Sequence, residues 1–189
     1  MGTQPEFGKL VVFGVGLIGG SFAQALKAVG QVEEIVGFGR SLGSLSQAID
    51  LGIIDRVGTN PGAEVADADL VLIATPVAQM PEIMERIAPY LGEQTLVTDG
   101  GSTKTDVVAA AREYFGERIG RFVPGHPIAG AEVSGPQHGY AELFVNRWCI
   151  LTPPARTSKA AVRKIAKLWQ GIGSKVEVME AEHHDRVLA

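Results

Sequence analysis

A glycine-rich turn is the first segment whose residue types and spacing could do chemistry. The stretch KLVVFGVGLIGG, residues 9–20, places Gly14, Gly16 and Gly19 at the spacing G-x-G-x-x-G, directly after an apolar run typical of a buried strand. In that setting the first glycine permits a tight turn and the second lets the backbone approach a pyrophosphate. The third lets the following helix pack closely on the strand. The turn therefore predicts a dinucleotide site.

The same stretch could also be the apolar core of an export signal, ending in the small-x-small pattern AQA. A signal peptide needs a positively charged start, and here Glu6 and Lys9 cancel. The glycines would weaken a helical core, and the apolar run is too short to span a membrane. We therefore expect a strand, a turn and a helix over 17–29, whose first N–H groups, at Leu17 and Ile18, bind the phosphates.

The end of the second expected strand, at 34–38, bears on which nucleotide is bound. An NAD site usually carries Asp or Glu there to accept a hydrogen bond from the ribose 2′-OH. Gly39, Arg40 and Ser41 occupy this position, so a carboxylate is missing and a 2′-phosphate has room. Arg40 could pair with that phosphate, stack on adenine, or simply be solvated. We expect NADP as the preferred cofactor and NAD as the alternative.

Polar residues follow three further expected strands. Thr75 and Pro76 end one apolar strand, the segment DGGSTK at 99–104 follows the next, and GHPIAGAEVSG at 125–135 follows a third. Ligands of open parallel sheets lie at the carboxyl ends of the strands. We expect Thr75 and Pro76 to contact the cofactor, and the other two segments to carry the chemistry.

Apolar strands alternate with helical patterns along the chain. This alternation predicts an α/β fold with a doubly wound, mostly parallel sheet covered by helices on both faces, of the Rossmann type. We expect residues 9–179 to form this dinucleotide-binding domain and residues 1–8 to be disordered. Residues 180–189 are expected to form the first helix of a C-terminal helical domain, of which only the start is present.

The composition narrows the class of function. With 46% hydrophobic and 20% charged residues and a net charge of −4, the chain predicts neither a nucleic-acid groove nor a basic membrane-binding surface. The single cysteine, Cys149, lies in an apolar run, where we expect a core residue in a reducing, cytoplasmic compartment. Four histidines and one cysteine show no metal-binding spacing, so no metal is expected. A small-molecule substrate remains the favoured ligand.

Several segments together resemble the prephenate and arogenate dehydrogenases of tyrosine biosynthesis. They are, in order, GVGLIGGS, ATPV, TDGGSTK, GHPIAGAEVSGP, ELF and the late HHD, and they span essentially residues 9–189. The resemblance implies an oxidative decarboxylation. In this reaction a hydride moves to the nicotinamide from the ring carbon that bears a hydroxyl, and loss of CO2 makes the ring aromatic. The resemblance also implies that His126 is the catalytic base, that Ser102 orients the hydroxyl, and that a further helical domain forms a homodimer.

The residues themselves support the first two roles. Oxidation of a hydroxyl needs a neutral base within hydrogen-bond reach, and histidine is available near neutral pH. Pro127 stiffens the segment that holds His126. Ser102 begins a helix expected over 102–115, so its alternative role is an N-cap.

Three further residues are candidates for substrate contact. Lys104 could balance charge near the substrate or only solvate a helix start. Glu132, six residues after His126, is expected at the mouth of the site or simply on the surface. His184, with Asp185, matches a His-Asp pair that the family carries at its domain junction.

Two other functions remain open. A β-hydroxyacid dehydrogenase or imine reductase shares the glycine turn, but we would expect a catalytic lysine on a later helix rather than GHPIAGAE. A non-catalytic nucleotide-sensing module would be expected to carry a fused helix-turn-helix or partner surface, which this sequence does not indicate.

Overall fold

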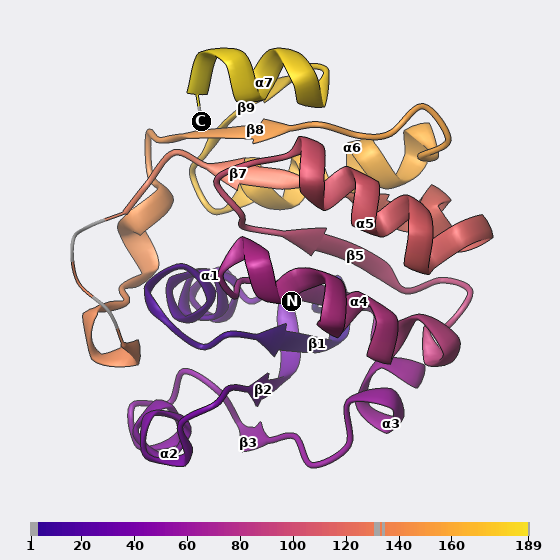
Figure 1. Ribbon diagram of the computed structural model, residues 1–189. Coiled ribbons are helices and arrows are strands. Elements are labelled where there is room, and N and C mark those ends of the chain that lie inside the picture. The colour runs from indigo at the N-terminus through magenta and orange to yellow at the C-terminus, as the bar shows by residue number, and fades with distance from the viewer. Residues whose placement is uncertain (1–3, 131–132, 134, 189) are drawn as a thin grey trace.

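A six-stranded parallel sheet forms the centre of the computed structural model, which describes residues 4–130, 133 and 135–188 (Figure 1). Its strand order is β3-β2-β1-β4-β5-β6, and every neighbouring pair is parallel. The order reverses between β1 and β4, which is where such sheets bind ligands. The strands are β1 (Phe7–Phe13), β2 (Val32–Phe38), β3 (Arg56–Val57), β4 (Leu70–Ile73), β5 (Leu96–Asp99) and β6 (Phe122–Val123).

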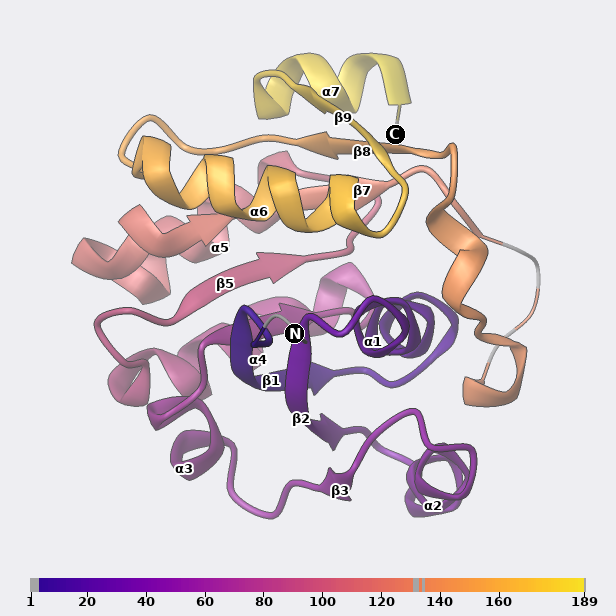
Figure 2. The ribbon, with the colours of Figure 1, turned by 180° about the vertical axis from the view of Figure 1, so that it is seen from behind.

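Helices cover both faces of this sheet. α4 and α5 lie over the face seen in Figure 1, and α1 and α6 lie over the opposite face, seen in Figure 2. Short 3-10 helices occupy Val77–Gln79, Ala88–Tyr90, Gly116–Arg121, Pro136–His138 and Ala141–Phe144. The α-helices are α1 (Leu17–Ala28), α2 (Leu42–Asp50), α3 (Pro61–Ala66), α4 (Met80–Ile87), α5 (Thr105–Phe115), α6 (Lys159–Gly171) and α7 (Ala181–Leu188).

Two hydrophobic cores result, one on each face of the sheet. Successive residues of a strand point to opposite faces. On β1, Leu10 and Val12 pack into the core shared with α1 and α6, while Val11 and Phe13 pack into the core shared with α4 and α5. The doubly wound α/β fold predicted from the alternating pattern is therefore confirmed.

A second, three-stranded sheet lies beside the first. It consists of β7 (Gly125–Pro127), β8 (Trp148–Leu151) and β9 (Lys175–Val178), with β7 antiparallel and β9 parallel to β8. The segment RFVPGHP, residues 121–127, is divided at Pro124 between β6 and β7. Proline has no N–H to give to a sheet, so the ladder is interrupted there and the chain passes to the second sheet.

Two expected boundaries were wrong. β1 begins at Phe7, so Phe7 and Gly8 belong to the sheet rather than to a disordered segment, because the Phe7 ring is buried in the core. α5 begins at Thr105 rather than at residue 102. Among the described residues, no helix has the length and apolar character needed to cross a membrane.

Candidate active site

A cleft of about 860 Å³ opens at the carboxyl ends of β1, β2 and β4, where the strand order reverses. Residues 13–16, 38–41 and 74–76 line it, each group directly after one strand, and the facing wall comes from α4. Segments far apart in the sequence meet here because parallel strands all end at one edge of the sheet. The expected cofactor residues Gly14, Gly16, Arg40, Ser41, Thr75 and Pro76 all line this cleft.

The glycine turn at the cleft has little room for side chains except at one position. Gly14 has a positive φ of 91°, and a Cβ there would lie 2.7 Å from the carbonyl oxygen of Ala74. At Gly19 a Cβ would lie 2.1 Å from the carbonyl oxygen of Gly14, so the helix can approach the strand only without a side chain. A Cβ at Gly16 would meet nothing within 4 Å, which leaves open space at the start of α1.

The lining of the cleft does not include Leu17, Ile18 or Gly19. Leu17 is buried and Ile18 packs against the same core. Leu17 and Ile18 are the first residues of α1, so their N–H groups have no partner within the helix and any phosphate contact would involve the backbone alone. The phosphate-binding role stays a prediction in this form.

A buried hydroxyl in the cleft fits a bound nucleotide. The Thr75 Oγ1 atom is inaccessible to solvent and has no hydrogen-bond partner within the described part of the chain. Buried polar groups are nearly always hydrogen-bonded in folded proteins. Together with the open space at Gly16, this unpartnered hydroxyl indicates room and a hydrogen-bonding group for a ligand.

The cleft is lined by a cation, Arg86, that the sequence analysis missed. Its α4 side carries Gln79, Glu82 and Arg86, and the exposed Arg40 lines the cleft from the end of β2. Their i, i+3, i+7 spacing places them on one helix face, and this was the pattern that could have found them. Ser41 also has a structural role, because its side chain accepts a hydrogen bond of 3.2 Å from the Ser44 N–H and caps α2.

His126 lies on β7 and meets the C-terminal helix. Its Nδ1 atom is 2.8 Å from Nε2 of His184, and Nδ1 of His184 is 2.7 Å from the Asp185 carboxylate. Burial, followed by the electrostatic effects of His184 and Lys104, lowers the pKa of His126 to about 4, against an opposing effect of Asp185. His126 is therefore a neutral ring at physiological pH, as a base requires.

A buried ion pair holds the segment beside His126. Asp99 and Lys104 are both fully buried, and Lys104 Nζ donates to the Asp99 carboxylate and, at 3.0 Å, to the Gly125 carbonyl. Asp99 also accepts from the N–H groups of Gly101 and Gly125. The Lys104 ammonium group therefore joins the 99–104 turn to β7, and a contact of Lys104 with substrate stays a prediction.

The other expected site residues have different outcomes. Ser102 is exposed in the 99–104 turn and does not cap α5, because the Asp185 carboxylate accepts from the N–H groups of Lys104 and Thr105, each at 2.8 Å. His184 is fully buried with both ring nitrogens engaged, and its expected contact with substrate stays a prediction. Glu132 lies outside the described residues. Cys149 is buried in the core, and burial raises the pKa of its thiol, as expected for an unreactive cysteine.

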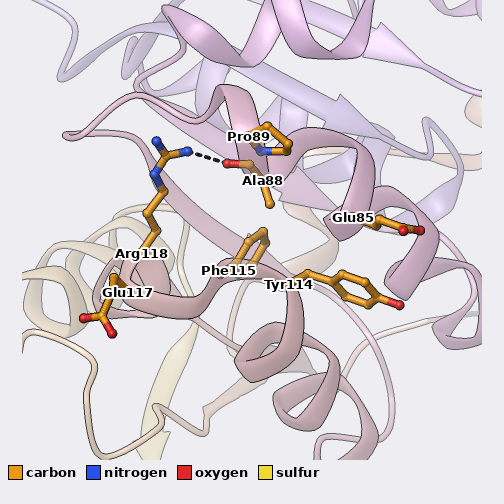
Figure 3. Close-up of a pocket in the computed structure, with 7 residues that line it drawn as sticks. All are labelled: Glu85, Ala88, Pro89, Tyr114, Phe115, Glu117 and Arg118. Carbon is orange, nitrogen blue, oxygen red and sulfur yellow. Dashed lines mark hydrogen bonds between the residues drawn. The ribbon is translucent and has the colours of Figure 1, made fainter.

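A second hollow, of about 400 Å³, lies apart from this cleft and gathers none of the expected site residues. Figure 3 shows its lining side chains, which come from α4, α5 and the short helices that follow them. The Arg118 guanidinium donates to the Ala88 carbonyl there and ties the two segments together.

Comparison with known proteins agrees with this geometry. A family model described as the nucleotide-binding domain of prephenate dehydrogenase matches residues 22–178. The chain belongs to the prephenate dehydrogenase family.

Relatives in this family are longer than the chain. It is 38% identical over 183 residues to the cyclohexadienyl dehydrogenase of Zymomonas mobilis, covering 97% of the chain and 62% of that protein. It is 37% identical to the prephenate dehydrogenase of Bacillus subtilis, of which it covers 48%. The chain thus spans about half to three-fifths of these curated relatives.

Solved structures of the family share its fold. Aquifex aeolicus prephenate dehydrogenase, solved in complex with hydroxyphenyl propionate and NAD+, has a TM-score of 0.87 and 37% identity. That match covers 99% of this chain and 63% of the other. Synechocystis arogenate dehydrogenase has a TM-score of 0.85 and 27% identity, over 94% of this chain and 62% of that one.

The open space at Gly16 predicts a selective effect of Gly16→Ala. The new methyl group meets no protein atom, so the free energy of unfolding should stay nearly unchanged. It would occupy the space expected for the diphosphate, and we expect nucleotide affinity to fall by about tenfold to a hundredfold, or about 1.4–2.8 kcal/mol, by calorimetric titration. Gly20→Ala is the control, since its Cβ would lie 3.8 Å from Ile53 and outside the cleft. Equal binding by both variants would contradict the phosphate role of this turn.

The buried ion pair predicts a large effect of Lys104→Met on stability. Removing the ammonium leaves the Asp99 charge buried without its cation, so we expect urea denaturation to show a loss of about 3–5 kcal/mol. Adding Asp99→Asn to this variant should recover part of the lost stability. Arg156→Met, at an exposed pair with Glu117, should change the stability by less than about 1 kcal/mol. A Lys104→Met variant as stable as Arg156→Met would show that the pair does not hold the turn.

Proposed function

We propose that this chain is the nucleotide-binding and catalytic part of an enzyme that oxidatively decarboxylates prephenate, arogenate or both. The carrying observation is His126, a neutral ring on β7, the strand that packs against the carboxyl end of β5. The names of the relatives support the reaction class, and both prephenate and arogenate dehydrogenases are among them. The products would be 4-hydroxyphenylpyruvate from prephenate and tyrosine from arogenate.

In the proposed reaction, a residue of this chain accepts the proton of the substrate hydroxyl. The nicotinamide, when bound, supplies a hydride acceptor. Because Nδ1 of His126 is engaged by His184, only Nε2 remains to accept the proton of the substrate hydroxyl. Ser102, in the turn held by the Asp99–Lys104 pair, is proposed to orient that hydroxyl. Loss of CO2 then makes the ring aromatic.

We propose NADP as the preferred nucleotide. Arg40 and Ser41 stand where an NAD site usually carries a carboxylate, and Arg86 adds a second positive charge to a lining that also contains Glu82. NAD stays the alternative, since the Aquifex aeolicus relative was solved with NAD+.

We also propose that the C-terminal helix begins a second, helical domain that forms a homodimer. α7 packs near α5, at the end of the molecule away from β3 (Figure 1). The greater length of the relatives supports this proposal.

The nucleotide preference gives a direct test. Titration should show tighter binding of NADP than of NAD, and Arg40→Gln should weaken NADP by about tenfold to a hundredfold, as expected when a charge-assisted hydrogen bond worth about 1.5–3 kcal/mol is lost. Binding of NAD should change little. Tighter binding of NAD, or an equal loss for both nucleotides, would remove Arg40 from the 2′-phosphate site.

The role of His126 predicts the outcome of His126→Asn in the natural polypeptide at its full length. Turnover of prephenate and arogenate should fall by about 10² to 10⁴ fold, the usual contribution of a general base, while nucleotide affinity stays unchanged. In the wild type, kcat/KM should persist below pH 6.5, because the pKa of His126 is lowered to about 4 and the ring loses its basic form only as the pH falls toward that value. Unchanged turnover by the variant would show that His126 is not the base, whereas nucleotide binding without any turnover by the wild type would favour a non-catalytic nucleotide-sensing role.

A further inference from the structure

We propose that His184 and Asp185 form a proton relay behind His126, in which His184 selects the tautomer of His126 and then takes over its proton. This inference rests on the proposed function of His126 as the base. His184 does not contact substrate in this scheme and is a positioning residue.

The hydrogen bonds of Asp185 determine which atom of His184 carries hydrogen. Its carboxylate accepts from the N–H groups of Lys104 and Thr105, both at 2.8 Å. Although burial opposes it, these bonds and the contact with His184 hold the pKa of Asp185 below its usual range. An ionised carboxylate only accepts hydrogen bonds, so the hydrogen in the 2.7 Å contact must lie on Nδ1 of His184.

The position of the hydrogen on His184 determines which nitrogen of His126 carries hydrogen. In a neutral ring with hydrogen on Nδ1, Nε2 of His184 is an acceptor. The hydrogen in the 2.8 Å contact between the two rings must then lie on Nδ1 of His126. Nε2 of His126 is therefore left without hydrogen, which is the form a base needs. An imidazole with hydrogen on Nε2 instead would present a donor to the substrate and could not accept its proton.

The same contacts allow the charge to move after the reaction. The hydroxyl proton binds to Nε2 of His126, and the hydrogen on Nδ1 of His126 can shift to Nε2 of His184. One proton enters the pair and one is transferred within it, so no other reactant is needed. The positive charge ends on His184, 2.7 Å from the Asp185 carboxylate, and away from the nicotinamide cleft.

The surrounding charges favour this transfer. His126 is disfavoured as a cation by burial and by the charge of Lys104, whose ammonium lies between Asp99 and the Gly125 carbonyl. His184 has the Asp185 carboxylate directly against its ring. The groups in contact with His184 are thus His126 from β7 and Asp185 from its own helix, while the charge of Lys104 acts on His126.

The tautomer can be tested without substrate. The 189-residue chain has four histidines, so ring ¹⁵N NMR of the histidine-labelled protein can be assigned with single His→Gln variants. Above its pKa, His126 should carry hydrogen on Nδ1 and none on Nε2, the reverse of the form that free imidazole side chains favour in water. His183→Gln, an exposed neighbour on the same helix, should leave this spectrum unchanged. A His126 ring with hydrogen on Nε2 would overturn the proposal, and this result needs no variant that could unfold.

Kinetics of the natural full-length polypeptide test the transfer. His184→Gln keeps an acceptor for the Nδ1–H of His126 but cannot take a proton. We expect kcat to fall by about tenfold to a hundredfold, because the positive charge must then stay on His126; partners hydrogen-bonded behind metal-bound histidines have effects of this size. The KM values for nucleotide and substrate should stay close to those of the wild type, as should all constants of His183→Gln.

The outcomes separate this inference from the proposed function. A His184→Gln enzyme with wild-type kcat at every pH would contradict the relay while leaving His126 as the base. A wild-type protein that oxidises neither prephenate nor arogenate would contradict the proposed function itself. Parallel losses of kcat and melting temperature, with normal kcat restored by cooling, would show a purely structural role for His184 and overturn the proposal.

Discussion

The arrangement of the candidate site depends on two opposite charges buried where the two sheets meet. Asp99 ends β5 and Lys104 lies five residues later, yet neither side chain reaches solvent. Removing two charges from water is costly, and their attraction offsets that cost only when further hydrogen bonds satisfy the remaining groups. Here the Gly101 and Gly125 N–H groups and the Gly125 carbonyl provide those bonds. The ion pair therefore fixes the position of β7, and with it His126, against the end of β5.

Close approach of the backbone is part of the same arrangement. A Cβ at Gly125 would lie 3.1 Å from the Asp99 carbonyl oxygen, so the absence of a side chain at this position favours the close approach of the strand that carries His126. The charged groups and the missing side chain act together. The buried pair fixes the orientation of β7, and the glycine allows the distance.

The Asp185 carboxylate connects the start of α5 with the C-terminal helix. Asp185 accepts the first N–H groups of α5 and also faces the ring of His184. A helix N-terminus is stabilised by negative charge, so one carboxylate both caps α5 and orients the histidine behind His126. The nucleotide cleft is built by different means, from strand ends at the switch point of the sheet and a turn of small residues. Its walls come from backbone and helix face, whereas His126, the proposed base, comes from the second sheet.

The sequence by itself determined the local features of this protein. The glycine turn, the alternation of strands and helices, and the position of Arg40 after β2 depend on residues close together in the chain, so their spacing was enough to predict the cleft. Only the tertiary structure decided the partners of the charged and titratable groups. Lys104 contacts Gly125 across 21 positions, and His126 meets His184 across 58. Likewise, the division of the segment RFVPGHP at Pro124 depended on which sheet each half could join. Burial and pairing of this kind arise from packing between distant segments, and spacing along the chain carries no record of them.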